Sequence, residues 1–139
     1  DANSGFINWE QKVNTNIKST LINDYLFSIT MNGFLTIIDS KNGNLIRATD
    51  IFSFLRKKNR KNLITGKIIK SKEKIEPVGF IVGIENLYVT TNTGRLLTVS
   101  IKTGKTQSVF KIDNGKISKP FIMNKNLFLA TDNSIIKLN

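Results

Sequence analysis

The chain of 139 residues contains no cysteine and no histidine. Without cysteine it can form no disulfide, carries no thiol nucleophile and holds no thiolate-bound metal. Without histidine it contains no Ser-His-Asp or Cys-His catalytic centre. Cysteine-free chains occur in oxidising and reducing compartments alike, so this absence leaves the compartment open.

Long apolar runs are also missing. A transmembrane helix needs about 20 mostly apolar residues, and the apolar runs here are only a few residues long. We therefore expect no membrane-spanning helix. No basic-then-apolar leader opens the chain, so we expect any targeting segment to have been removed or to precede Asp1.

Acidic residues are few and scattered. The nearest pair in sequence, Glu73 and Glu76, lies in a strongly basic segment, so we predict no general acid/base pair and no catalytic residue. The loop Asp113–Lys116 has the composition of a calcium loop but lacks the further oxygen ligands that such a loop requires. We read it as a connection between strands, and we expect neither a metal nor a cofactor.

Positive charge is abundant and unevenly distributed. The net charge is +11, and nine basic residues against Glu73 alone place +8 of it between Arg56 and Lys74. Such a segment indicates an acidic protein, an anionic polymer or anionic lipid as partner. The competing interpretation is a solvated loop in a chain rich in Ile, Lys and Asn through AT-rich codon usage.

A weak internal repeat organises the chain. Leu26–Asn44 aligns without a gap on Leu87–Lys105, 61 residues later, with Gly33 and Gly43 in the places of Gly94 and Gly104. A third copy, Leu127–Asn139, lacks one residue at its turn, and the opening "DANSGFINW" matches the second half of a unit. Repeats of this length predict stacked structural units.

Each unit predicts four antiparallel strands. Short β-branched and aromatic runs alternate with Asn, Gly and Asp, as in strands and hairpin turns. Glycine supplies the positive φ that tight turns need, and we expect Asn133 to do the same in the third unit. The predicted strands are 18–23, 79–84 and 119–124 (first), 25–30, 86–91 and 126–131 (second), 34–39, 95–100 and 134–139 (third), and 6–11, 44–49 and 105–110 (fourth). A single helix over Asp50–Lys58, capped by Asp50, is the one exception.

Four-stranded units of about 40 residues are typical of β-propeller blades. We therefore predict an all-β fold, a partial β-propeller of about three blades. Residues 1–139 form one propeller fragment, and residues 51–76 form a basic insertion between two blades. Three blades fall below the usual ring, so we expect self-association through blade edges or an open arc from a longer chain.

The opening segment, residues 1–9, carries a family resemblance. Asp1, Ser4, Gly5 and Trp9 fill the pattern Asp, two variable residues, Thr or Ser, Gly, three residues, Trp, which resembles the repeat of the pyrroloquinoline-quinone (PQQ)-like propeller superfamily. The resemblance implies that Trp9 packs between blades. At the tryptophan position of the later units stand Arg47 and Ser108.

Two branches of that superfamily compete. A quinoprotein dehydrogenase fragment would imply a calcium-bound quinone in blades outside this chain. The non-enzymatic branch, similar to the propeller lipoprotein of the outer-membrane β-barrel assembly machine (BamB-like), implies a periplasmic scaffold, and the short last strand resembles the C-terminus of that type. We favour the second branch, with membrane association through a segment preceding Asp1.

The favoured function is therefore a non-catalytic scaffold that binds a protein partner in outer-membrane protein assembly. The alternatives are the quinoprotein fragment and a basic module for anionic polymer or lipid headgroups, with nucleic acid the least favoured. Strand order places the insertion on the same face as the turns at Gly33 and Gly94. The predicted partner-docking residues are Arg56, Lys57, Lys58, Arg60, Lys61, Arg95 and Arg47.

Overall fold

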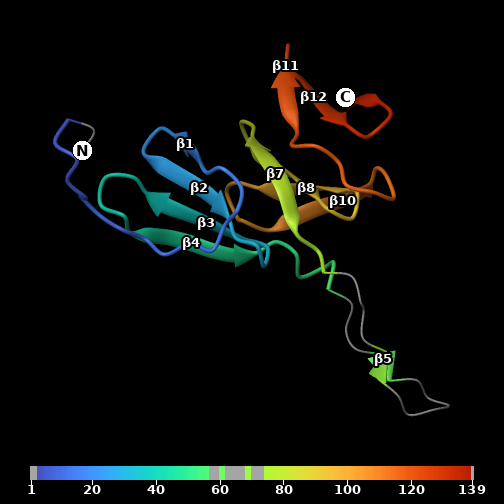
Figure 1. Ribbon diagram of the computed structural model, residues 1–139, viewed down its shortest axis with the longest axis horizontal. Helices are drawn as coiled ribbons and strands as arrows, with labels where there is room; N and C mark the ends of the chain where they lie inside the picture. Colours follow the sequence, from blue (N-terminus) through green and yellow to red (C-terminus); the bar gives the residue numbers. More distant parts are fainter. Residues whose placement is uncertain (1–2, 57–59, 62–67, 70–73, 139) are drawn as a thin grey trace.

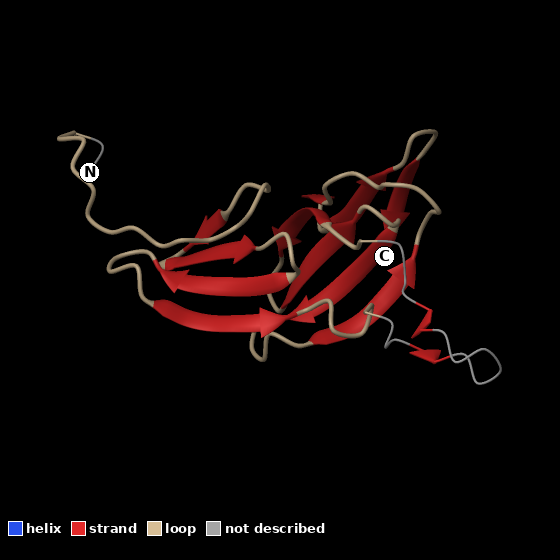
Figure 2. Cartoon of the chain, turned by 60° about the horizontal axis from the view of Figure 1, so that its bottom comes forward, coloured by secondary structure: helices blue, strands red, loops and turns tan. Residues whose placement is uncertain are grey.

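The computed structural model describes residues 3–56, 60–61, 68–69 and 74–138, and these form strands, turns and loops without a helix (Figure 2). Three antiparallel sheets follow one another along the chain (Figure 1). The first comprises β1 (Thr20–Ile22), β2 (Tyr25–Ile29), β3 (Phe34–Asp39) and β4 (Leu45–Asp50). The second comprises β7 (Pro77–Val82), β8 (Asn86–Thr91), β9 (Arg95–Ser100) and β10 (Thr106–Lys111), and the third β11 (Phe121–Met123), β12 (Asn126–Ala130) and β13 (Ile135–Leu138). The predicted all-β, partial propeller is confirmed.

Strand register confirms the alignment of the repeat. Leu26 faces Ile38 in the first sheet, and Leu87 faces Val99 in the second, a shift of 61 residues in both strands. In the third sheet Leu127 faces Leu138, so the later strand has shifted by one residue less. The single missing residue therefore falls in the turn between β12 and β13, as the sequence predicts.

Glycine forms the turns of the first two sheets. Gly33 and Gly94 connect the second and third strands with φ of +79° and +69°, and Gly43 and Gly104 have φ of +74° and +71° in the next turns. These left-handed conformations are costly for a residue with a Cβ. The local preference of glycine thus sets the four hairpins.

The third sheet forms its turn differently. The prediction of a positive φ at Asn133 is wrong, because the described non-glycine residues with positive φ are Asn23, Asn124 and Lys125. Instead, Thr131 N–H donates to Ser134 O at 2.8 Å, and the two hydroxyl oxygens lie 2.8 Å apart. This turn is one residue shorter than those at Gly33 and Gly94. Side-chain contacts between Thr131 and Ser134 hold it, and it needs no left-handed residue.

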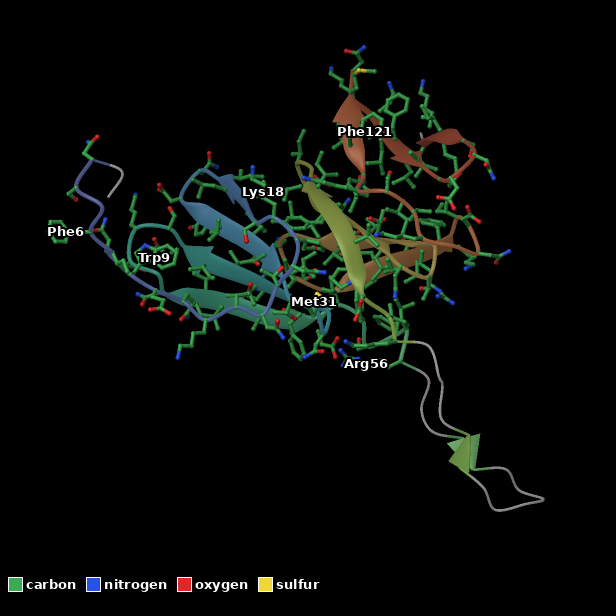
Figure 3. The ribbon with its side chains drawn as sticks, in the orientation of Figure 1. Phe6, Trp9, Lys18, Met31, Arg56 and Phe121 are labelled. Atoms are coloured by element: carbon green, nitrogen blue, oxygen red, sulfur yellow. The ribbon has the colours of Figure 1, made fainter. Side chains whose placement is uncertain are left out.

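The predicted strand over residues 6–11 is wrong as well. This segment is irregular, and Phe6 and Ile7 are 76% and 81% exposed. Trp9 lies against the first sheet, whereas Phe6 points away from it (Figure 3). Within the described residues β13 pairs with β12 alone, so residues 6–11 do not add a strand to the third sheet. A strand needs a partner strand, and no strand in the described part of the chain pairs with this segment.

The predicted helix over Asp50–Lys58 is reduced to one turn. Asp50 Oδ1 accepts the Phe52 N–H at 3.0 Å, which is the expected cap. Phe52 O then accepts the N–H groups of Leu55 and Arg56 at 2.9 and 3.2 Å. Phe52 is buried against Gly33, so the segment is held by its contact with the first sheet rather than by helical propagation. Residues 57 and 58 lie outside the described residues.

The main core lies between the first and second sheets. Phe27, Ile29 and Ile37 of the first sheet pack with Leu97 and Val99 of the second, together with six further buried side chains. Between the second and third sheets the buried cluster contains only Leu96, Ile117 and Leu129. The third sheet is therefore held by much less buried apolar surface than the other two. No helix in the described part of the chain has the length and apolar character to cross a membrane.

Candidate functional site

The first basic residue of the insertion is Arg56, which is fixed on the first sheet. Its guanidinium pairs with the Asp50 carboxylate and donates to Asn32 O. It also lies 6.0 Å from the centre of the Phe34 ring, within cation–π range. Figure 3 shows Arg56 where the first sheet gives way to the insertion. Because Asp50 offsets its charge, Arg56 anchors the insertion and adds little free positive charge.

The insertion ends on the equivalent turn of the second sheet. The Asn92 side chain accepts the Glu76 N–H at 2.9 Å and donates to Lys74 O at 2.9 Å. Asn92 N–H in turn donates to Glu76 O at 3.0 Å. Its two ends are thus tied to the turns at Gly33 and Gly94, which places the insertion on the face that strand order predicts.

A short hairpin lies within the insertion. β5 (Arg60–Lys61) pairs with β6 (Ile68–Ile69) in a two-stranded sheet, and no strand of the three larger sheets pairs with it. Figure 1 shows this hairpin projecting away from the sheets. Lys57 and Lys58 lie outside the described residues. The backbone of Arg60 and Lys61 is therefore carried away from the packed part of the molecule.

Arg95 provides a second cationic centre on the same face. Its Nη1 donates to Thr93 Oγ1 at 2.6 Å, and Lys111, directly opposite it on β10, donates through Nζ to Thr93 O at 2.8 Å. Like charges facing each other across strands are unfavourable. Neither residue takes part in an ion pair among the described residues. No carboxylate among the described residues therefore pairs with either charge.

Arg47 is not part of this face. Its Nη1 donates to Ile101 O at 2.9 Å, and its Cδ would lie 2.9 Å from a Cβ built on Gly104. Ile101 and Gly104 belong to the turn between β9 and β10, at the opposite end of the second sheet from Thr93. The structure separates Arg47 from Arg56 and Arg95 and places it between the first and second sheets.

The position of Arg47 repeats that of Trp9. Trp9 Nε1 donates to Ser40 O at 2.9 Å, and its ring would lie 2.8 Å from a Cβ on Gly43. Ser40 and Gly43 correspond to Ile101 and Gly104 under the 61-residue shift. Sequence reasoning identified the shared position but not the contact. Each side chain reaches a backbone carbonyl that is remote in sequence, Ser40 O for Trp9 and Ile101 O for Arg47. No local sequence pattern indicates such a contact.

The acidic side chains of the described residues do not cluster. No three acidic side chains come together in residues 3–56, 60–61, 68–69 and 74–138 as a metal site would require. The pKa of Lys41 is raised because its ammonium hydrogen-bonds to the Asp24 carboxylate at 2.8 Å. Lys41 lies in the turn after β3, at the other end of the first sheet from Arg56, so it takes no part in the candidate surface.

Comparison with known proteins supports the fold. No protein-family model matches the chain, and no curated protein matches it. A quinohemoprotein alcohol dehydrogenase, ADHIIG of Pseudomonas putida HK5, superposes on 87% of the chain with a TM-score of 0.58 and 14% identity. The chain spans 17% of that protein.

Two further structures resemble the chain less closely. The β-propeller domain of Myceliophteria thermophila Cps50 (Swd1) covers 82% of it at 17% identity, with a TM-score of 0.44 and 47% of its own length matched. BamB from Moraxella catarrhalis covers 86% at 14% identity, with a TM-score of 0.40 and 42% of its own length matched. With its three sequential antiparallel sheets, the chain has the fold of a partial β-propeller.

Proposed function

We propose that the chain is a non-catalytic propeller scaffold that binds an acidic protein partner through the basic insertion and Arg95. The observation that carries this proposal is the hairpin β5–β6, which shares no strand pairing with the three sheets and projects from them (Figure 1). Packing of the blades does not require such a hairpin. The segment that contains it nevertheless carries most of the net charge.

The fixed ends of the insertion support this interpretation. Arg56 and Asn92 tie them to the turns at Gly33 and Gly94, so the insertion has a defined base on the first two sheets. Clustered charge steers the association of a partner of opposite charge. A periplasmic location and a role in outer-membrane protein assembly belong to the same proposal. They rest on the family resemblance of the opening segment, residues 1–9.

The test compares two charge reversals that change the net charge equally. One replaces Lys57, Lys58 and Lys61 by Glu, and the other replaces the exposed Lys12, Lys102 and Lys105 by Glu. Binding of a labelled 20-residue peptide rich in Glu is measured by fluorescence anisotropy across a salt series. We expect the first variant to lose at least tenfold in affinity, mainly through slower association, and the second to lose less than threefold.

Competition distinguishes the alternative partners. Heparin stands for anionic polymers, and phosphatidylglycerol vesicles stand for lipid headgroups. Displacement of the peptide by heparin at far lower charge-equivalent concentration, with the steep salt dependence of polyanion binding, would favour the polymer. Equal loss of affinity in both triple variants would overturn the proposed docking surface.

A further inference from the structure

The fourth strands of the first two sheets share a bulge that aims one side chain at a neighbouring sheet. In the first sheet the register skips Ile46, so that Ile37 faces Arg47. In the second it skips Gln107, so that Thr98 faces Ser108. Bulges commonly re-aim a side chain. Arg47 fills the space between the first and second sheets, and Ser108 is its counterpart on the side of the third sheet.

Ser108 has a much shorter side chain than Arg47 and lines an open space. A cavity of about 620 Å³ lies between the second and third sheets, within the usual size range of small-molecule sites. Ser108 and Thr98 line it from the second sheet, and Leu127 and Leu138 line it from the third. Ser108 therefore borders an open, largely apolar space between the second and third sheets.

The lining defines the chemistry of an occupant. Tyr88, Leu96 and Phe110 supply further apolar and aromatic surface beside Leu127 and Leu138. The hydroxyl groups of Ser108 and Thr98 are the small polar groups typical of such sites. A molecule with an aromatic or aliphatic body would bury that body here while keeping hydrogen-bonding partners.

Both charged residues that line the cavity are basic. Lys111 and Lys125 are the only charged residues that line the cavity. The ammonium of Lys111 already donates to Thr93 O at 2.8 Å. Lys125 is exposed, in the turn between β11 and β12, and takes part in no ion pair among the described residues. Lys125 is therefore the cation best able to meet an anionic group at the cavity.

We propose that this cavity binds a small amphipathic monocarboxylate, with its apolar body between the second and third sheets and its carboxylate at Lys125. This site uses none of the predicted docking residues. Its failure and that of the acidic-partner proposal are therefore separate outcomes.

Octanoate is the test ligand, and octanol is its neutral counterpart. Titration of the whole chain is followed by methyl NMR of the cavity residues Leu96, Leu127 and Leu138, with the exposed Leu21 and Leu45 as internal controls. We expect saturable shifts at the three cavity leucines and none at the controls. Shifts of equal size at both sets would mean non-specific adsorption and would overturn the proposal.

Two variants test the assignment of residues. Ser108→Trp places in the cavity the side chain found at the equivalent position 9, and it should abolish the saturable shifts. Ser53→Trp, at an exposed site, is the matched control and should leave them unchanged. Lys125→Gln should weaken octanoate at least fivefold while leaving octanol within twofold.

Lys125→Gln keeps the proposal falsifiable if Ser108→Trp does not fold. Lys125 lies in an exposed turn, so its substitution is not expected to disturb the core. Octanoate binding that survives Ser108→Trp in a folded protein would contradict the site. Equal weakening of octanoate and octanol by Lys125→Gln would contradict the role of the ammonium.

Discussion

Arg47 lies over Gly104 as Trp9 lies over Gly43, and each donates a hydrogen bond to the carbonyl three residues before its glycine, at Ile101 and Ser40. Two chemically different side chains thus perform one packing task. Both present a flat group with an N–H at its edge, and both lie against a backbone without a Cβ. Arginine at position 47 thus makes the same kind of contact, to a glycine and to a carbonyl, that tryptophan makes at position 9.

The equivalence predicts the order of two substitutions. Arg47→Ala removes the packing and leaves Ile101 O without its partner, so it should lower the free energy of unfolding by about 1.5–3 kcal/mol. Arg47→Trp can donate through its indole N–H as Trp9 does, so it should cost less than the alanine substitution. Urea denaturation of the three proteins measures the difference. A tryptophan variant less stable than the alanine variant would show that the two positions are not equivalent.

The glycines beneath these side chains predict a second effect. Gly43→Ala would place a Cβ 2.8 Å from the Trp9 ring at a φ of +74°, so we expect a loss of about 1–3 kcal/mol. Gly115→Ala is the control, because no heavy atom lies within 4 Å of its added Cβ and its φ is not in the left-handed region. The control should stay within about 0.5 kcal/mol of the parent chain. Thermal unfolding followed by circular dichroism distinguishes the two.

Contrasting roles of two neighbouring phenylalanines provide the third prediction. Phe52 is 1% exposed and lies on Gly33, whereas Phe54 is 73% exposed. Phe52→Ala should lower the free energy of unfolding by about 3–5 kcal/mol by opening a cavity in the main core. Phe54→Ala should change it by no more than about 0.5 kcal/mol. If the two variants unfold at the same urea concentration, the start of the insertion is not part of the core.

Features encoded in a few neighbouring residues could be predicted from the sequence. The turns at Gly33, Gly43, Gly94 and Gly104 follow from the conformational freedom of glycine, and the strands between them follow from β-branched runs. The face on which the insertion emerges followed from strand order alone.

Features that depend on a distant partner could not be predicted. Residues 6–11 have a strand-like composition, but a strand forms only where another strand can pair with it. Arg47 reaches a carbonyl 54 residues away, and no local pattern indicates such a contact. The prediction of a positive φ at Asn133 was wrong for a local reason. The third hairpin is one residue shorter than the other two, and contacts between Thr131 and Ser134 close it instead.

The last prediction concerns the anchor of the insertion. Arg56 pairs with Asp50 in a partly buried setting, where their side chains are 49% and 26% exposed, and it also holds Asn32 O. A double-mutant cycle with Arg56→Gln and Asp50→Asn should give a coupling free energy of about 0.5–1 kcal/mol that decreases as salt is added. Asparagine keeps the oxygen that caps the Phe52 N–H, so the cycle isolates the ion pair. The matched control is Lys41 with Asp24, whose side chains are 71% and 58% exposed, and their coupling should be smaller because solvent screens it more strongly. If Arg56 and Asp50 show no coupling at low salt, the insertion is not anchored through this pair, and its hairpin would lose the defined base on which the proposed docking of an acidic partner depends.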